Sequence, residues 1–326
     1  MATFKSLIDA FDSLTGTAAI PPAALGTSQS PSFIAGDAVT VPTGGFTGLY
    51  AFGDSLSDAG NVGFLTRGLE PTAPYSNGRF SNGSVWVQQL AQNLGLPAVK
   101  ASLTGGTDYA YGGAETGTNP QHPAAPIDLQ AQLAQFDLNV PAPSANALYT
   151  VWAGSNDILG MADSNETPAQ QKAGVQQAAD NEATMIKGLI AHGARNLVVL
   201  DVPDLSKTPS GLAAPNTAPV KSELAQMFNA DLGAALQSIM ATGAAKIDYV
   251  DTFGLLDAAI ANPGAVGLTN VTQPAWTGGY TNPNSGTFNA VGAAQSGYLF
   301  FDGLHPTATG HTLLANSVTQ TLTGTA

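Results

Sequence analysis

The chain has 326 residues, of which 44% are hydrophobic and only 10% are charged, so it can bury a large core and is unlike a disordered protein. Its net charge is −13 with ten Lys and Arg. This argues against binding to nucleic acid or to an anionic membrane surface, because both depend on clustered basic side chains. The absence of cysteine excludes disulfides, thiolate catalysis and cysteine-ligated metal.

Residues 1–46 are predicted to form a leader or a packing arm, separate from a domain at 47–326. Phe4–Leu14 has the spacing of a short amphipathic helix, and a stretch rich in Pro and Gly follows it. Lys5 is the only early cation and acidic residues interrupt the apolar stretch, so no secretory signal peptide is recognisable. No stretch has the roughly 18 apolar residues of a membrane span. The composition, poor in Lys and rich in Ala, Gly, Thr and Asn, favours a secreted bacterial protein exported without such a signal.

From Gly48 onward, short apolar segments alternate with helical patterns. Five segments are predicted to form strands: Gly48–Phe52, Asp108–Tyr111, Ala147–Trp152, Asn196–Val202 and Lys246–Asp251. Helices are predicted between them, one beginning at Thr167 and Pro168 and ending at Gly193, and others around Leu224–Ile239 and Leu313–Leu322. This alternation predicts an α/β fold with a parallel sheet covered on both faces.

One region breaks the alternation. Residues 262–298 are rich in Gly, Asn, Pro and Thr, and stretches of this length without regular structure are usually functional when they are ordered. Trp276 and Tyr280 lie inside this region. We interpret it as a candidate lid over an apolar pocket, with Trp276 as a candidate substrate-binding residue.

A serine lies directly after the first predicted strand, in the sequence FGDSLSD. Ligands bind at the carboxyl ends of parallel strands, so the hydroxyl of Ser55 is a candidate nucleophile, although a serine there is more often a helix cap. Near the end of the chain, the sequence DGLHP places an acid and a base three residues apart, Asp302 and His305. That spacing lets Asp302 fix the tautomer and orientation of the imidazole, which a general base requires.

Two further segments are weaker signals. AGSND follows the third predicted strand, where Asn156 can aim a side-chain N–H at an oxyanion, but Ser, Asn and Asp are equally typical of a helix cap. AYGGA follows the second predicted strand, where glycine lets a backbone N–H approach a ligand closely, but an ordinary tight turn also explains it.

Taken together and in this order, FGDSLSDAGN, DYAYGGA, AGSND and FDGLHPTATGH resemble the sequence blocks of the GDSL/SGNH hydrolase family. The segment YSNGRFSNGSVWVQQLAQNLGL, residues 75–96, resembles the stretch that follows the first block in that family. The resemblance implies a flavodoxin-like three-layer α/β/α sandwich with a central five-stranded parallel sheet. It also implies a serine ester hydrolase, an esterase or lipase that forms a covalent acyl-enzyme and needs no metal or cofactor. Asp108 stands where the family usually has Asn, which we regard as a minor departure.

The resemblance also assigns roles to individual residues. Ser55, His305 and Asp302 are expected to form a catalytic triad. The backbone N–H groups of Ser55 and Gly113, with Gly112 as the alternative glycine, and the side chain of Asn156 are expected to form the oxyanion hole. In addition, we interpret the two acids beside these candidates, Asp54 and Asp157, as loop-shaping residues and candidate substrate-binding residues.

Two other functions remain open at this point. An acyltransferase would use the same site and pass the acyl group to an alcohol or a sugar. A non-catalytic binding protein would keep the fold alone, although the intact set of four site residues argues against it. Short acyl esters, lipids and acetylated sugars all remain candidate substrates, and neither the oligomeric state nor the role of residues 1–46 follows from the sequence.

Overall fold

The structure is a computed structural model that describes residue 41 and residues 45–118 and 125–323. The predicted helix at Phe4–Leu14 lies outside the described residues, and the division of the chain near residue 46 stays a prediction. No helix in the described part is long and apolar enough to cross a membrane.

The centre of the fold is a parallel sheet of four short strands. They are β1 (Leu49–Gly53), β2 (Leu148–Trp152), β3 (Asn196–Leu200) and β4 (Lys246–Val250), paired in the order β1-β2-β3-β4. Nearly all their side chains are buried, as expected for strands covered on both faces. The predicted α/β class with a parallel sheet is confirmed.

The central sheet has four strands rather than the five expected from the sequence. The segment Asp108–Tyr111 does lie beside β1, where the N–H of Tyr109 donates to the carbonyl of Ala51 at 2.7 Å. It forms only isolated bridges, however. The carbonyls of Asp108 and Ala110 accept hydrogen bonds from the Asn61 side chain, at 2.8 and 2.9 Å. The carbonyl of Asp108 also accepts from the N–H of Ser102 at 2.7 Å, beside an isolated bridge to Ala101. Single bridges and a side-chain contact therefore take the place of the continuous strand that the sequence pattern predicted.

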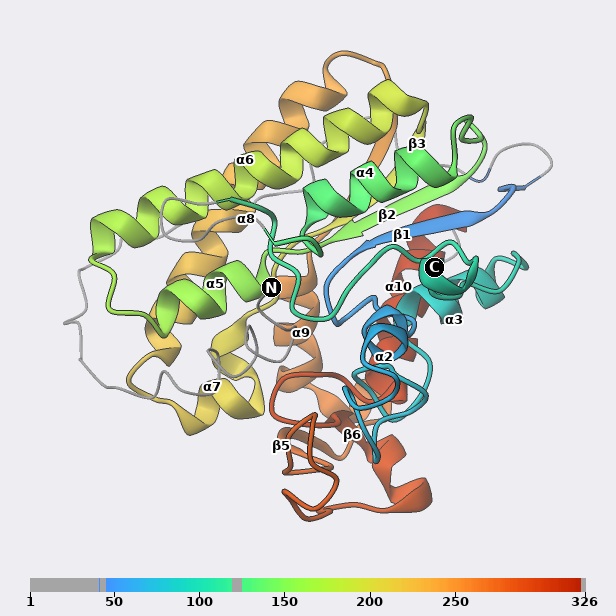
Figure 1. The fold of residues 1–326 in the computed structure, drawn as a ribbon. Coiled ribbons are helices and arrows are strands. Elements are labelled where there is room, and N and C mark those ends of the chain that lie inside the picture. The colour runs from blue at the N-terminus through green and yellow to red at the C-terminus, as the bar shows by residue number, and fades with distance from the viewer. Residues whose placement is uncertain (1–40, 42–44, 119–124, 324–326) are drawn as a thin grey trace.

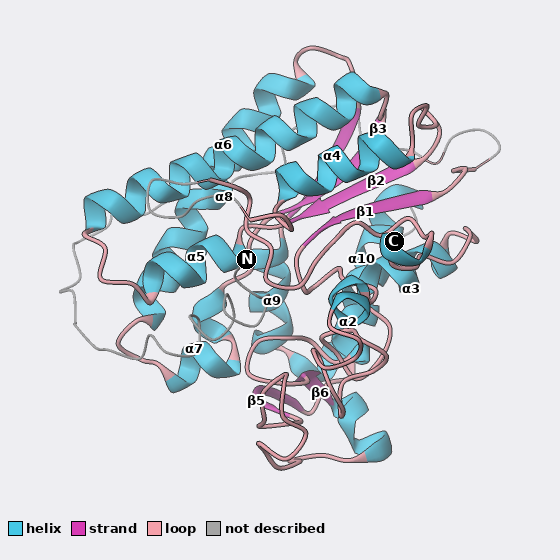
Figure 2. Ribbon diagram, in the orientation of Figure 1, coloured by secondary structure: helices cyan, strands magenta, loops and turns pink. Residues whose placement is uncertain are grey.

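Helices cover both faces of this sheet (Figures 1 and 2). On one face lie α4 (Leu129–Asn139), α6 (Pro168–His192) and α8 (Ala218–Met240). On the other lie α3 (Trp86–Asn93) and α10 (Ala308–Thr323). The arrangement is the expected three-layer α/β/α sandwich.

The boundaries of α6 follow from its end residues. The hydroxyl of Thr167 accepts a hydrogen bond from the N–H of Gln170, and Pro168 occupies the first helical position. Gly193, with φ of 130°, ends the helix. The predicted start and end of this helix are confirmed.

Shorter elements surround the carboxyl end of the sheet. They are α2 (Asn61–Leu65), α5 (Ser155–Ala162), α7 (Pro209–Ala213) and α9 (Thr252–Ala261). The Gly- and Asn-rich region 262–298 is ordered and contains β5 (Asn270–Pro274), which pairs in parallel with β6 (Tyr298–Phe300). The sequence analysis did not predict these two strands.

The four strands end at one level. Gly53 lies opposite Trp152, Trp152 opposite Leu200, and Leu200 opposite Val250. The segments that follow β1 and β2, a loop with Ser55 and the start of α5 with Asn156, therefore begin side by side. This register places the segments singled out in the sequence at a common edge of the sheet.

One ionisable side chain on α6 is buried without a hydrogen-bond partner among the described residues. Glu182 is fully buried, and neither carboxylate oxygen has a hydrogen-bond partner among the described residues. Burial, reinforced by the neighbouring acids Asp157, Asp54 and Asp201, raises the pKa of Glu182 well above its ordinary value. The folded chain therefore keeps this group protonated at pH values where the unfolded chain ionises it.

We expect Glu182→Gln to be more stable than the wild type above the ordinary Glu pKa. A raised folded-state pKa contributes stability that is complete below the unfolded-state pKa and is lost as the pH rises. The gain should be small near pH 4 and should grow toward pH 8, because the unfolded wild-type chain ionises Glu182 over this range and the folded chain does not. Urea unfolding at both pH values measures it. Glu223→Gln, at an exposed position of α8, is the matched control, and a gain of equal size at both pH values would contradict the prediction.

Candidate active site

The loop that carries Ser55 is held rigidly at the end of β1. Gly53 has φ of 146°, and a Cβ at this position would lie 2.1 Å from the carbonyl oxygen of Trp152, so only glycine fits. The side chain of Gln132, from α4, accepts from the N–H of Gly53 at 2.9 Å and donates to its carbonyl at 2.8 Å. After the serine, Asp54 Oδ1 accepts from the N–H of Leu56 at 2.9 Å. Ser55 thus leaves the sheet on a turn that is hydrogen-bonded on both sides.

The structure brings Ser55, His305 and Asp302 into one hydrogen-bonded chain. Ser55 Oγ lies 2.9 Å from His305 Nε2, and His305 Nδ1 lies 2.8 Å from Asp302 Oδ2. Burial raises the pKa of Asp302, but the attraction of His305 and the hydrogen bonds that Asp302 accepts outweigh burial and hold the pKa below its ordinary value. Because Asp302 is then a carboxylate, Nδ1 donates to it, and Nε2 accepts from the serine hydroxyl.

Asp302 is fixed by more than the imidazole. Its Oδ1 accepts from the N–H groups of Leu304 at 2.8 Å and His305 at 2.6 Å. Its Oδ2 accepts a further hydrogen bond from the hydroxyl of Tyr75 at 2.7 Å. Both carboxylate oxygens therefore accept hydrogen bonds, and these fix the orientation of the side chain.

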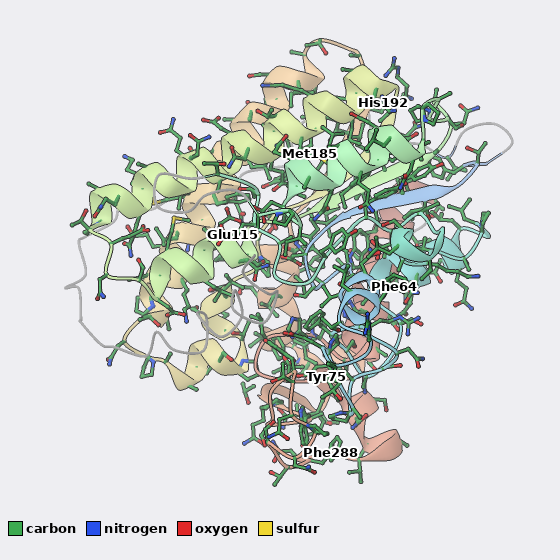
Figure 3. The ribbon with its side chains drawn as sticks, in the orientation of Figure 1. Phe64, Tyr75, Glu115, Met185, His192 and Phe288 are labelled. Carbon is green, nitrogen blue, oxygen red and sulfur yellow. The ribbon has the colours of Figure 1, made fainter. Side chains whose placement is uncertain are left out.

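Aromatic rings surround the imidazole. The ring centroid of His305 lies 5.2 Å from that of Phe80 and 5.4 Å from that of Tyr280. Tyr75 in turn packs edge-on against Tyr280 and Phe301. Figure 3 shows Tyr75 between the sheet and the β5–β6 region. The sequence analysis missed these contacts, because Tyr75 and Phe80 belonged to a segment noted only for its resemblance, and no sequence pattern pairs them with His305.

The two glycines after Tyr111 have different roles. Gly112 donates its N–H to Asp58 Oδ2 at 2.9 Å, and a Cβ at this position would lie 2.2 Å from the ring of Phe80. Gly113 has φ of 80°, and the described residues make no hydrogen bond with its N–H. Of the two, Gly113 is therefore the one with a donor left for a ligand.

Asn156 lies in the first turn of α5 and has one donor to spare. One N–H of its amide is directed at the carbonyl of Ala114 at 2.8 Å, which fixes the side chain. The amide carries two N–H donors, so one remains. The backbone N–H of Ser55 likewise makes no hydrogen bond within the described residues. Each of the three predicted oxyanion donors therefore has a hydrogen free.

Asp58 connects the loop that carries Ser55 to the turn at Gly112 and Gly113. Its carboxylate accepts from the N–H groups of Gly60, Asn61 and Val62 at the start of α2, besides that of Gly112. Burial raises the pKa of Asp58 to about 6 despite these hydrogen bonds. Asp58 carried no functional prediction, since nothing in the sequence indicates which backbone groups a loop carboxylate will meet.

Asp108, the departure from the family pattern, also connects these loops. Its Oδ1 accepts from the N–H of Ala110 at 3.1 Å and its Oδ2 from the N–H of Ala59 at 2.5 Å. Both carboxylate oxygens thus act as acceptors, so an aspartate fits this position.

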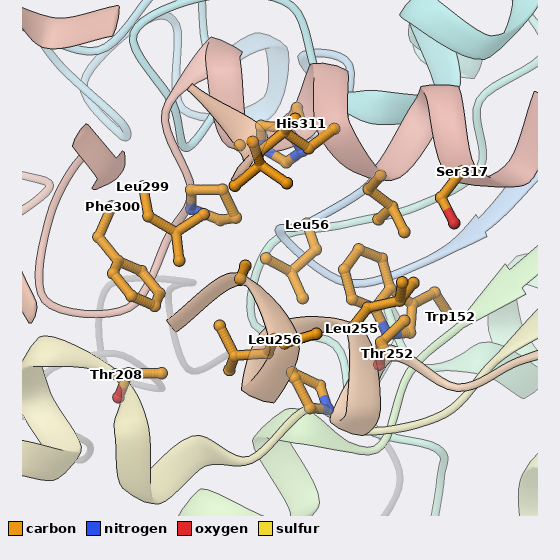
Figure 4. A pocket seen from close by; sticks show the side chains of 18 of the residues that line it. Leu56, Trp152, Thr208, Thr252, Leu255, Leu256, Leu299, Phe300, His311 and Ser317 are labelled. Carbon is orange, nitrogen blue, oxygen red and sulfur yellow. The ribbon is translucent and has the colours of Figure 1, made fainter. Parts of the chain in front are cut away.

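A cavity of about 810 Å³ opens beside Ser55 (Figure 4). Ser55, Leu56, Ser155 and Asn156 line it where the strands end. Asp54 lines it as well, and burial raises the pKa of Asp54 to about 6. The hydroxyl of the candidate nucleophile therefore lies in the wall of a cavity large enough for a small-molecule ligand.

A family model described as GDSL-like lipase/acylhydrolase matches residues 49–318. The chain belongs to this family. The match covers the strands, the cavity lining except Gln320, and all the site residues described above.

Curated relatives fit this assignment to the GDSL-like family. The chain is 28% identical to a phosphatidylcholine-sterol acyltransferase of Aeromonas hydrophila, over 72% of this chain and 67% of that protein. It is also 28% identical to an acetylesterase of Thermothelomyces thermophilus, over 85% and 88%. Among solved structures, an acetylxylan esterase from Geobacillus stearothermophilus aligns over 87% of this chain and 96% of its own, with 12% identity and a TM-score of 0.45.

Two of the predicted substrate-binding residues lie outside the cavity of this GDSL-family chain. Asp157 accepts hydrogen bonds from the N–H and hydroxyl of Thr116, at 3.0 and 2.8 Å, and burial raises its pKa well above the ordinary value. Trp276 is buried against Phe288, with ring centroids 4.8 Å apart, in a cluster with Tyr75 and Phe301 rather than in the cavity wall. From the candidate lid, only three residues near its start line the cavity: Asn262, Ala265 and Val266.

A second histidine lies near the site but does not contact Ser55. His311, on α10, is buried, its ring nitrogens have no partner among the described residues, and burial lowers its pKa to about 3. It is therefore neutral near pH 7, and the imidazole hydrogen-bonded to the serine is that of His305. No group of three or more His, Asp or Glu side chains in the described ranges is arranged to hold a metal ion.

Proposed function

We propose that this member of the GDSL-like lipase/acylhydrolase family is a serine ester hydrolase, with Ser55 as nucleophile, His305 as general base and Asp302 as the acid that orients the imidazole. The observation that carries the proposal is the continuous chain from Ser55 Oγ to His305 Nε2 at 2.9 Å and from His305 Nδ1 to Asp302 Oδ2 at 2.8 Å. Nucleophile, base and orienting group are then each within hydrogen-bond reach of the next.

The first half of the reaction transfers the acyl group to the serine. His305 Nε2 takes the proton of Ser55 as Oγ attacks the ester carbonyl. The resulting oxyanion accepts hydrogen bonds from the N–H groups of Ser55 and Gly113 and from the remaining N–H of Asn156. His305 then gives its proton to the leaving alcohol oxygen as the ester C–O bond breaks, which leaves Ser55 acylated.

The second half releases the acid. His305 takes a proton from water, which attacks the acyl-Ser55 carbonyl, and then returns a proton to Oγ as the acid leaves. An alcohol in place of water would make the protein an acyltransferase, which we keep as a second candidate because one of its relatives carries that name. Adding an alcohol to the assay and measuring the ratio of new ester to free acid separates the two functions.

The test is reaction with a fluorophosphonate together with hydrolysis of p-nitrophenyl esters. We expect release of p-nitrophenol, and a covalent adduct on the peptide that contains Ser55. A chain that is folded yet neither labelled nor active would support the non-catalytic alternative. An adduct on another residue would mean that the nucleophile is misassigned.

Tyr75→Phe should lower kcat about 10- to 100-fold with little change in KM, because it removes a hydrogen bond to a charged group worth about 1.5–3 kcal/mol and leaves the ring in place. The hydrogen bond helps to lower the pKa of Asp302, so the acidic limb of the pH–rate profile should also move to higher pH. Steady-state kinetics across pH measure both. A higher KM with unchanged kcat and pH profile would show that Tyr75 does not position the Asp302–His305 pair.

A further inference from the structure

The cavity beside Ser55 extends well beyond the reacting groups, between α9 and α10. The wall from α9 is formed by Thr252, Leu255, Leu256 and Ala259, which recur at the spacing of one helix face. Figure 4 shows residues of this wall facing those of α10 across the cavity, with Leu56 and Trp152 beside them. The two helices thus leave a continuous space that begins at the candidate nucleophile.

The lining of this space is apolar. Leu, Ala, Val, Phe and Pro side chains make up most of it, and Asp54, beside the serine, is the only carboxylate among the lining residues. Leu255 is 38% exposed although it is a large hydrophobic side chain. An apolar surface left uncovered at a binding site favours an apolar ligand group, whose burial is driven by release of water.

The length of the space fits a fatty acyl chain. The wall from α10 runs from Gly310 to Gln320, with Leu313, Leu314 and Ser317 between them. At 1.5 Å per residue these positions span about 15 Å along the helix axis. The hydrocarbon core of a bilayer is about 30 Å thick and contains two layers of acyl chains, so one chain of a membrane lipid spans about 15 Å. An acetyl group would leave nearly all of this space unfilled.

We propose that the cavity between α9 and α10 binds the acyl chain of the ester, so that the substrate class is esters of long-chain fatty acids rather than acetyl esters. This inference rests on the proposed function, since it takes Ser55 as the point of acyl transfer. The acyl carbonyl lies at Ser55 and Asn156, and the hydrocarbon chain extends from there between the two helices. The alcohol part leaves the site outside this cavity.

The experiment introduces a bulky side chain into each of the two helical walls of the cavity, in separate variants. Ala259→Phe on α9 and Ser317→Phe on α10 place a ring in the space that the chain would occupy. The matched controls are Ala261→Phe and Thr321→Phe, which lie on the same helices at exposed positions outside the lining. Each protein is assayed with p-nitrophenyl esters from acetyl to hexadecanoyl, and with acetate esters of alcohols of increasing length.

We expect wild-type kcat/KM to rise with acyl length, since each buried methylene contributes a factor of about four. Both cavity variants should lose on the order of 100-fold on the hexadecanoyl ester, which corresponds to the lost burial of about three or four methylenes. Their loss of activity on the acetyl ester should be much smaller than on the hexadecanoyl ester, and the activity that remains shows that they fold. The two control variants should match the wild type throughout.

Three results would overturn the inference while leaving the proposed function intact. They are a wild type that prefers the acetyl ester, cavity variants with an unchanged chain-length profile, and a loss confined to acetates of long alcohols, which would place the alcohol in the cavity. Absence of hydrolysis of every ester by the wild type would instead contradict the proposed function itself.

Discussion

Ser55→Ala should abolish ester hydrolysis, with a loss of kcat on the order of 10⁶-fold, the size seen when the nucleophile of other serine hydrolases is removed. The variant keeps the backbone N–H of residue 55, the N–H of Gly113 and the side chain of Asn156. It therefore retains oxyanion stabilisation without a covalent route, and a small residual rate above that in water is expected. The fluorophosphonate adduct should be absent, and the stability should change little because the hydroxyl forms no bond to the core other than that to His305.

Ser57→Ala is the matched control for this variant. The hydroxyl of Ser57 lies in the same loop but accepts the indole N–H of Trp86 at 3.0 Å, in the core between α3 and the sheet. Its removal leaves that buried donor unpaired and should cost about 1–3 kcal/mol of stability, while activity stays within about tenfold. Should Ser57→Ala abolish labelling and Ser55→Ala retain it, the nucleophile assignment would be wrong.

Asp302→Asn should lower kcat/KM by about 10⁴-fold near pH 7, by analogy with the same change in another serine hydrolase triad. The amide oxygen can still accept from the N–H groups of Leu304 and His305, so the loop should keep its shape. The amide NH₂ would replace Oδ2, which now accepts from His305 Nδ1 and Tyr75. With an N–H donor facing it, Nδ1 must act as the acceptor, and the imidazole proton moves to Nε2. Nε2 then carries a hydrogen toward Ser55 and cannot accept the proton of the serine hydroxyl.

Kinetics and thermal unfolding of Asp302→Asn, measured side by side, test this account. Loss of activity in a protein that unfolds within a few degrees of the wild type is the expected result. If Asp302→Asn retained more than about a tenth of the activity, the imidazole would be oriented by another group, and Asp302 would not be part of the triad. The double variant with Tyr75→Phe should lose little more than Asp302→Asn alone, because both act on one hydrogen-bonded unit.

Much of the site could be predicted from the sequence because its parts are short local segments. Asp302 and His305 are three residues apart, so one loop sets their geometry, and their bond at 2.8 Å depends on little else. Ser55 and Asn156 each follow a strand, and parallel strands that end at one level bring such residues together. Periodicity and end residues likewise predicted α6 and the four strands of the sheet.

The contacts that could not be predicted depend on residues distant in the chain. Tyr75 reaches Asp302 across 227 residues, and Asp58 reaches Gly112 across 54. A tyrosine or an aspartate in a loop can form hydrogen bonds with many different groups, and only the tertiary fold determines which of them is near. Trp276 illustrates the opposite error, since a large aromatic side chain in a Gly-rich region indicates burial but not which cavity or core it fills. Its position against Phe288 comes with an isolated antiparallel bridge between these two residues, which periodicity did not reveal.

The hydrogen bond between Ser55 and His305 joins positions 250 residues apart, close to the two ends of the described domain. Loop-closure entropy makes such a contact late to form, after the intervening strands and helices have docked. Enzyme activity is then the most stringent probe of complete refolding, because native secondary structure can return before the first and last segments meet. Under the proposed mechanism, the same separation means that no stretch short of the whole domain can carry out the reaction, because the proposed nucleophile and base lie near its opposite ends.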